Sequence, residues 1–227
     1  MNQIIAENML AGLLLVAGGY GIGLAVSRKL KHPLFNPLLI AILVVAAVLI
    51  FTGTAAESLK TSAAPLTGLL TPATVCLAIP LSKQLQLLKK NYKAILCGCL
   101  AGVLASLLGI LGLSLLFSLP DPEYAGLLPK SVTTAIGIGI AEELGGNTTL
   151  TIAAIIITGI TGNVLAETVC RVFRIQSPIA KGVAIGTSSH AIGTTKAMEI
   201  GATEGAVSSL AMIIAGLSTV ILAPFFR

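Results

Sequence analysis

The sequence predicts an all-α polytopic membrane protein with about six full transmembrane helices, two re-entrant or broken helical segments and an inverted repeat. The first observation is composition: 55% of the 227 residues are hydrophobic and only 10% are charged. Soluble domains carry about 25% charged residues, so these few cannot cover a soluble surface, and so apolar a chain is not disordered. Long unbroken apolar runs also exclude the short alternating strands of a β-barrel.

The second observation is the spacing of the charges. A transmembrane helix needs about 20 apolar residues, and six charge-free windows reach that length. These windows are 8–27, 33–56, 61–82, 94–120, 144–166 and 205–226. Two shorter windows, 131–141 and 182–195, are rich in Gly, Ser and Thr and are poor candidates for lipid-facing helices. We predict one integral membrane domain over 1–227, with scaffold spans in 1–120 and a re-entrant segment followed by a span in each of 121–170 and 171–227.

The positions of the basic residues predict how the chain is oriented in the membrane. The net charge is +5. The basic residues form three clusters: Arg28, Lys29 and Lys31; Lys83, Lys89, Lys90 and Lys93; and Arg171, Arg174 and Lys181. If both short windows enter and leave on the same side, six spans place every cluster in the cytoplasm and both termini outside. If both windows cross, eight spans place the third cluster outside. Because cytoplasmic loops are enriched in Lys and Arg, six spans are favoured and eight are the alternative.

The third observation is an internal repeat. Residues 135–145 read AIGIGIAEELG and residues 191–201 read AIGTTKAMEIG, which are identical at six of eleven positions with an offset of 56. Ala, Gly and Ile are common here and match easily by chance, but Glu143 and Glu199 also fall at one register. With six spans the two copies enter from opposite sides. Such an inverted repeat with interrupted helices is a recurrent design of secondary transporters, whose substrate lies near the midplane.

Two polar segments within the repeat are the predicted binding site. PKSVTT (129–134) offers a cation, hydroxyls and a helix start, and helix N-terminal N–H groups with a lysine favour an anion. GTSSHAIGTTK (186–196) places seven polar groups in eleven residues. The predicted substrate-binding residues are Lys130, Ser131, Thr133, Thr134, Thr187, Ser188, Ser189, His190, Thr194, Thr195 and Lys196. The alternatives are snorkelling of Lys130 to the interface and hydroxyls that only bond neighbouring helices.

Four residues are candidates for ion or proton coupling: Glu143, Glu199, Asn163 and His190. The glutamates would pair with Lys130 and Lys196 or carry protons, or else mark hairpin ends at the interface. Asn163 has an interhelical hydrogen bond as its structural alternative, and His190 a bond to a neighbouring carbonyl. No nucleophile motif, P-loop or metal-ligand spacing is present in the sequence, so we expect no enzyme activity, catalytic residue, metal or cofactor.

Three strings resemble the LrgB/CidB family of bacterial antiholin-like membrane proteins, and the plant plastidal glycolate/glycerate translocator carries a similar domain. The strings are LLTPATVCLAIPL (69–81), LPKSVTTAIGIGIAEELGGNTTLT (128–151) and GVAIGTSSHAIGTTKAMEIGATEGAVSSLAM (182–212). The similarity extends over residues 36–226. The chain departs from the family pattern at Ala135, where proline is usual, and at Ser82, where the family often has PLY.

The resemblance implies a multi-pass protein of the bacterial plasma membrane and two different functions. One is secondary transport of small monocarboxylates such as glycolate, glycerate, lactate or pyruvate. The other is control of murein hydrolase export and lysis with a small LrgA/CidA-type membrane partner. We favour the carrier, because a regulator gives no reason for two polar, interrupted, repeated segments. The expected partners are a small carboxylate, the lipid bilayer and a second copy of the chain, with no nucleic acid.

Overall fold

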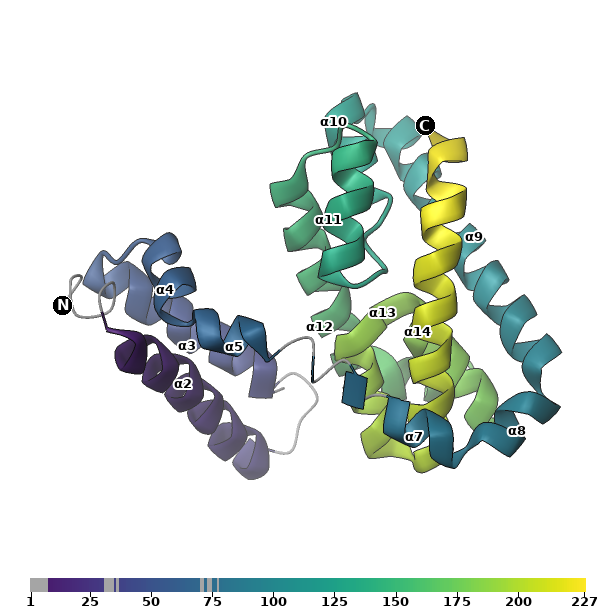
Figure 1. Ribbon diagram of the computed structural model, residues 1–227, viewed down its shortest axis with the longest axis horizontal. Coiled ribbons are helices and arrows are strands. Elements are labelled where there is room, and N and C mark those ends of the chain that lie inside the picture. The colour runs from purple at the N-terminus through teal and green to yellow at the C-terminus, as the bar shows by residue number, and fades with distance from the viewer. Residues whose placement is uncertain (1–7, 31–34, 36, 70–71, 73–74, 77) are drawn as a thin grey trace. The chain divides into compact units, whose positions relative to one another are not determined.

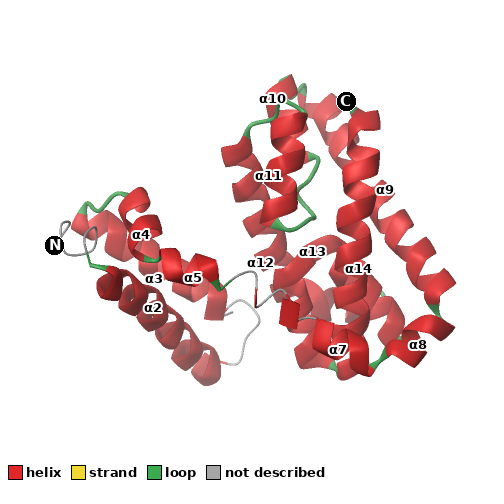
Figure 2. Ribbon diagram, viewed as in Figure 1, coloured by secondary structure: helices red, strands yellow, loops and turns green. Residues whose placement is uncertain are grey.

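The computed structural model describes residues 8–30, 35, 37–69, 72, 75–76 and 78–227, and the regular structure in these ranges is entirely helical (Figures 1 and 2). The predicted all-α class is therefore confirmed. Contacts divide the chain into two units, Met1–Cys76 and Leu77–Arg227, and each is described by itself.

The first unit contains α2 (Met9–Leu30), α3 (Pro37–Thr52), α4 (Ala56–Ser62) and α5 (Ala64–Gly68). Buried glycines on one face of α2 hold it against its neighbours: Gly19 lies against Val45 of α3, and a β-carbon at Gly23 would clash with the Pro37 carbonyl. Small residues of this kind let membrane helices approach closely.

The second unit contains α7 (Ala78–Lys83), α8 (Leu85–Lys90), α9 (Tyr92–Phe117), α10 (Asp121–Leu127), α11 (Thr134–Glu143), α12 (Thr148–Val172), α13 (Pro178–Ile200), α14 (Ala202–Leu222) and the 3-10 turn η2 (Ala223–Phe226). One apolar cluster joins the end of α9 to α10, α11 and the end of α14. Another joins the start of α9 to α8, the start of α13 and the start of α14. Helices α9 and α14 therefore run in the same direction, with α10 and α11 at one end of the unit and α7, α8 and α13 at the other (Figure 1).

Helix α12 runs in the opposite direction. Its start lies beside α10, where the Thr151 hydroxyl donates to the Gly126 carbonyl at 2.7 Å. The end of α14 lies at the same end of the unit, since the Tyr124 hydroxyl donates to the Phe226 carbonyl. The segments α12 and α14, which follow the two polar windows, are therefore antiparallel.

Within the described residues, four helices are long and apolar enough to cross a membrane: Met9–Leu30, Tyr92–Phe117, Thr148–Val172 and Ala202–Phe226. They confirm the predicted windows 8–27, 94–120, 144–166 and 205–226 as helical. The helix in window 33–56 is shorter than expected, because α3 ends at Thr52 and α4 continues at a bend of 118°. The two helices make a fifth candidate span only if they are counted as one.

The window 61–82, predicted as a span, is not one continuous helix in the part of it that the structure describes. Helix α4 ends at Ser62, α5 covers only Ala64–Gly68, and α7 begins at Ala78. Pro65 cannot donate the hydrogen bond that would carry α4 onward, so the break before it has a local cause. Most of the Thr-Pro-Ala-Thr stretch (71–74), whose proline could also interrupt this span, lies outside the described residues.

Both short polar windows lie in helical hairpins. We call 121–143, comprising α10, the turn and α11, hairpin A, and 178–200, which is α13, hairpin B. A β-carbon on Gly193 would lie 3.3 Å from the Ile185 carbonyl eight residues earlier, a separation of about 12 Å along a straight helix. In hairpin A, Gly137 stands in the same relation to Pro129, at 3.5 Å. Each segment therefore turns back toward the end where it began.

Tight packing of hairpin B on α14 gives a stability prediction. A β-carbon at Gly186 would clash with the Ser208 carbonyl, whereas one at Gly139, on hairpin A, meets nothing within 4 Å. Overpacking costs about 1–3 kcal/mol, and replacing an open helical glycine by alanine gains up to about 1 kcal/mol. Gly186→Ala should therefore lower the melting temperature of the purified protein, and Gly139→Ala should preserve or raise it. Equal melting temperatures for the two variants would contradict this close approach.

Candidate binding site between two helical hairpins

The tips of the two hairpins both reach α9. Ser106 of α9 places its hydroxyl oxygen 3.2 Å from that of Ser131, in the turn of hairpin A. One turn earlier, a β-carbon at Gly102 would lie 2.9 Å from the hydroxyl oxygen of Thr187, in hairpin B. Ser131 and Thr187 are separated by the repeat offset of 56. Equivalent residues of the two hairpins thus meet the same helix one turn apart.

Other contacts repeat with the same offset. A β-carbon at Gly126 would lie 3.2 Å from the Thr151 hydroxyl oxygen, and one at Gly182 would lie 2.7 Å from the Val207 β-carbon. Adding 56 to the first pair gives the second pair. We call hairpin A with α12 and hairpin B with α14 the two halves of the repeat. In each half, therefore, a glycine of the hairpin lets the first turns of the next helix approach closely.

The two halves also exchange contacts. Ile136 of hairpin A packs on Gly216 of α14, and Ile192 of hairpin B packs on Gly159 of α12. Each hairpin thus places its equivalent isoleucine against the long helix of the other half. Reciprocal contacts of this kind are what a two-fold relation between the halves would produce.

His190 forms the reversal of hairpin B. Its backbone has φ 43° and ψ −138°, a left-handed conformation that favours glycine. The buried ring places Nε2 3.0 Å from the Ile155 carbonyl oxygen of α12, and Gly159 leaves room for the ring. In a neutral imidazole this carbonyl makes Nε2 the donor and leaves Nδ1 an acceptor. Nδ1 makes no hydrogen bond to another residue of the described ranges.

Lys130 supplies a partly buried cation in the turn of hairpin A. Its ammonium donates to the Ser131 hydroxyl at 2.9 Å, and no carboxylate of the described residues lies within 4.0 Å of it. The predicted pair with Glu143 is not formed, because Glu143 is exposed at the far end of α11. A partly desolvated ammonium without a counterion attracts an anion strongly.

Lys196, unlike Lys130, is paired with carboxylates. Its ammonium lies 2.7 Å from a Glu167 carboxylate oxygen and 3.2 Å from one of Glu199. The predicted Lys196–Glu199 pair is confirmed, and Glu167, on α12, is an additional partner. Two carboxylates therefore compensate Lys196, whereas Lys130 has no carboxylate of the described residues beside it.

Most hydroxyls of hairpin B bond within the protein. Thr194 donates to the His190 carbonyl at 2.8 Å and lies 2.9 Å from the Ser208 hydroxyl. Thr195 donates to the Ile192 carbonyl at 2.7 Å, and Asn163 binds the same carbonyl at 2.7 Å. These contacts agree with the interhelical alternative for Asn163 and with a structural use of the threonines.

The remaining predicted residues surround the two turns. Thr187 and Ser189 are buried, Ser188 is exposed, Thr133 precedes α11 in an extended conformation and Thr134 begins it. Ser106 and Glu167 were not predicted. Ser106 is a polar residue within the charge-free window 94–120, which is a usable signal, but nothing in the linear sequence pairs it with hairpin A.

The LrgB-like family model matches residues 17–227. This chain belongs to the LrgB family. Among relatives of the family, "Holin-like protein CidB" of Staphylococcus aureus is 34% identical over 99% of this chain and 97% of its own length. "Holin-like protein CidB" of Staphylococcus epidermidis is 32% identical over the same shares. "Uncharacterized protein YwbG" of Bacillus subtilis is 36% identical over 84% of each chain. No solved structure matches the chain.

Proposed function

We propose that this LrgB-family protein carries small monocarboxylates across the bacterial plasma membrane, with its site between the hairpin tips. The observation that carries the proposal is the meeting of Ser131 and Thr187 on α9, from hairpins that begin at opposite ends of the unit. In this proposal the two hairpins are re-entrant and the halves form an inverted repeat. Interrupted backbone at membrane depth requires surrounding protein or a polar cavity, as at a transporter midplane.

The charges of the second unit favour hairpins that re-enter over hairpins that cross, which is the choice that separates the six-span orientation from the eight-span one. The cluster of Lys83, Lys89, Lys90 and Lys93 adjoins the start of α9, and Arg171, Arg174 and Lys181 lie around the start of α13. Because an apolar core joins these two starts, both clusters lie at one end of the unit. The positive-inside rule makes that end cytoplasmic.

Labelling tests this orientation. Single cysteines at Lys89 and Arg174, in a background without native cysteines, should both be shielded from an impermeant thiol reagent in intact cells and both react after permeabilisation. A cysteine at Asp121, which is exposed at the opposite end of the unit, is the matched control and should react without permeabilisation. Reaction at Arg174 with protection at Lys89 would support eight spans.

The tips offer complementary groups for a 2-hydroxycarboxylate. Lys130 supplies the countercharge, and the free N–H groups and hydroxyls at the start of α11 add donors at Thr133 and Thr134. The Nδ1 acceptor of His190 suits the substrate hydroxyl. Uptake of labelled glycolate, lactate and pyruvate into proteoliposomes containing this chain alone tests the proposal.

The names of the relatives favour a second candidate more directly than they favour transport. Two relatives covering nearly the whole chain are named holin-like, which supports an antiholin-like regulator of murein hydrolase export and lysis. A small LrgA/CidA-type membrane protein and a second copy of this chain are its proposed partners. If the proteoliposomes move no carboxylate while deletion of the gene alters lysis, this candidate replaces the carrier. Transport together with altered lysis would make lysis a consequence of metabolite flux.

A further inference from the structure

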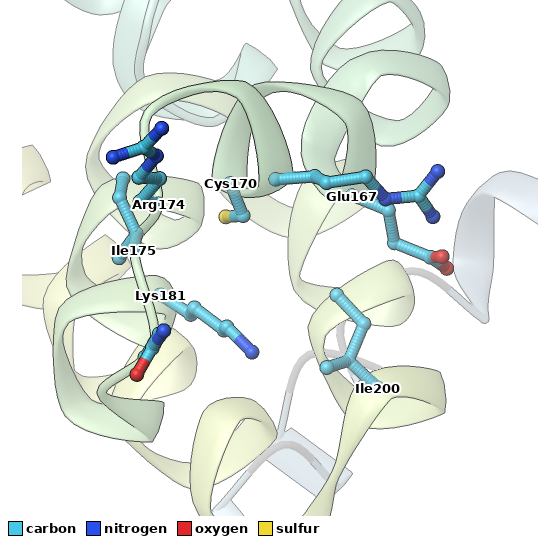
Figure 3. Close-up of a pocket in the computed structure, with 8 residues that line it drawn as sticks. Glu167, Cys170, Arg174, Ile175, Lys181 and Ile200 are labelled. Carbon is cyan, nitrogen blue, oxygen red and sulfur yellow. The ribbon is translucent and has the colours of Figure 1, made fainter.

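A cavity of about 670 Å³ opens at the end of the second unit where α12 connects to α13. Its lining includes Glu167, Cys170, Arg171, Arg174, Lys181 and Ile200 (Figure 3). Figure 3 shows the Lys181 side chain extending into the opening, with the Cys170 thiol on the adjacent wall. The residues proposed to bind carboxylate, Lys130 and His190, are not part of this lining.

The lining of this cavity carries an excess of positive charge, with three cations and one carboxylate among the residues that the structure describes. Glu167 is the carboxylate of the lining, and Lys196 already binds it at 2.7 Å. Arg171, Arg174 and Lys181 have no carboxylate within 4.0 Å among the residues that the structure describes. Three cations therefore line a space large enough for a polyatomic anion.

We infer that this cavity binds a phosphate group, presented by the headgroup of an anionic lipid. Guanidinium groups match phosphate oxygens with paired hydrogen bonds, and lysine adds a point charge. Basic pockets between membrane helices at the cytoplasmic end bind such headgroups. Val172 at the end of α12 and Phe173, which follows it, are also exposed, so apolar surface for acyl chains lies nearby. This site goes beyond the proposed transport function and is independent of it.

The test uses the purified full-length protein in detergent, with the melting temperature measured against added phosphatidylglycerol, phosphatidylcholine or inorganic phosphate. Phosphatidylglycerol should raise the melting temperature and phosphatidylcholine should not. Neutralising Arg171, Arg174 or Lys181 to glutamine should weaken the apparent affinity about fivefold for each residue, and the triple variant should lose the shift. Lys89→Gln, exposed at the same end but outside the lining, is the matched control and should keep it.

A variant that is expected to strengthen lipid binding distinguishes a specific loss of binding from misfolding. Glu167→Gln removes the carboxylate of the lining, so phosphatidylglycerol should bind more tightly, which a poorly folded protein would not do. A shift produced equally by inorganic phosphate, and lost in the triple variant, would support the phosphate site and assign it to a soluble ligand. A lipid shift that persists in the triple variant, or that Lys89→Gln abolishes equally, would overturn the inference.

Discussion

Lys130→Gln is expected to reduce carboxylate transport about ten- to a hundredfold, because hydrogen bonds to charged groups contribute about 1.5–3 kcal/mol each. The structure singles out this lysine: it is partly buried in the turn of hairpin A, and no carboxylate of the described ranges lies within 4.0 Å of it. The measurement is the initial rate of labelled glycolate uptake into proteoliposomes, normalised to reconstituted protein.

Two other lysines serve as controls for that experiment. Lys93 is exposed at the start of α9, so Lys93→Gln should transport like the parent. Lys196 is held by Glu167 and Glu199, so any loss in Lys196→Gln should be accompanied by a lower melting temperature. If Lys130→Gln transports at the parental rate, Lys130 is not the substrate counterion and the site lies elsewhere.

His190→Gly is expected to abolish most transport while keeping the protein folded. The backbone at His190 has φ 43°, and glycine adopts this conformation without the strain of about 1–3 kcal/mol that other residues bear. That relief offsets the loss of the bond to the Ile155 carbonyl, which is worth about 0.5–1.5 kcal/mol net. Melting temperature should therefore stay near the parental value while uptake falls at least about tenfold through the loss of Nδ1.

His190→Ala separates the backbone effect from the side-chain effect. It removes the same ring but keeps a β-carbon at positive φ, so it should be less stable than His190→Gly and equally poor in transport. Normal uptake by His190→Gly would show that the imidazole only holds hairpin B against α12. That result would favour the regulatory function over the carrier.

The sequence by itself determined the helical membrane class, four of the long helices and the position of the two polar interrupted segments. A helix in lipid satisfies its backbone hydrogen bonds within the segment, so a charge-free apolar run predicts a span without knowledge of its neighbours. The interruptions of the helices at His190 and in the turn of hairpin A lie within the two polar segments themselves, so the local sequence also predicts them. The repeat extends further than the eleven residues that revealed it, since Pro122 in the first turn of hairpin A and Pro178 at the start of hairpin B are separated by the same offset of 56.

The tertiary structure alone decided which polar residues have partners. Lys130 and Lys196 look alike in the sequence, but packing of α12 against α13 brings Glu167 to Lys196 and no carboxylate of the described residues to Lys130. The same packing brings the Ile155 carbonyl to His190 and thereby decides which ring nitrogen accepts. Residues about 30 positions apart make these contacts from different helices. The charge and the hydrogen bonds available to a ligand are therefore set by how the helices pack, and no local periodicity encodes that packing.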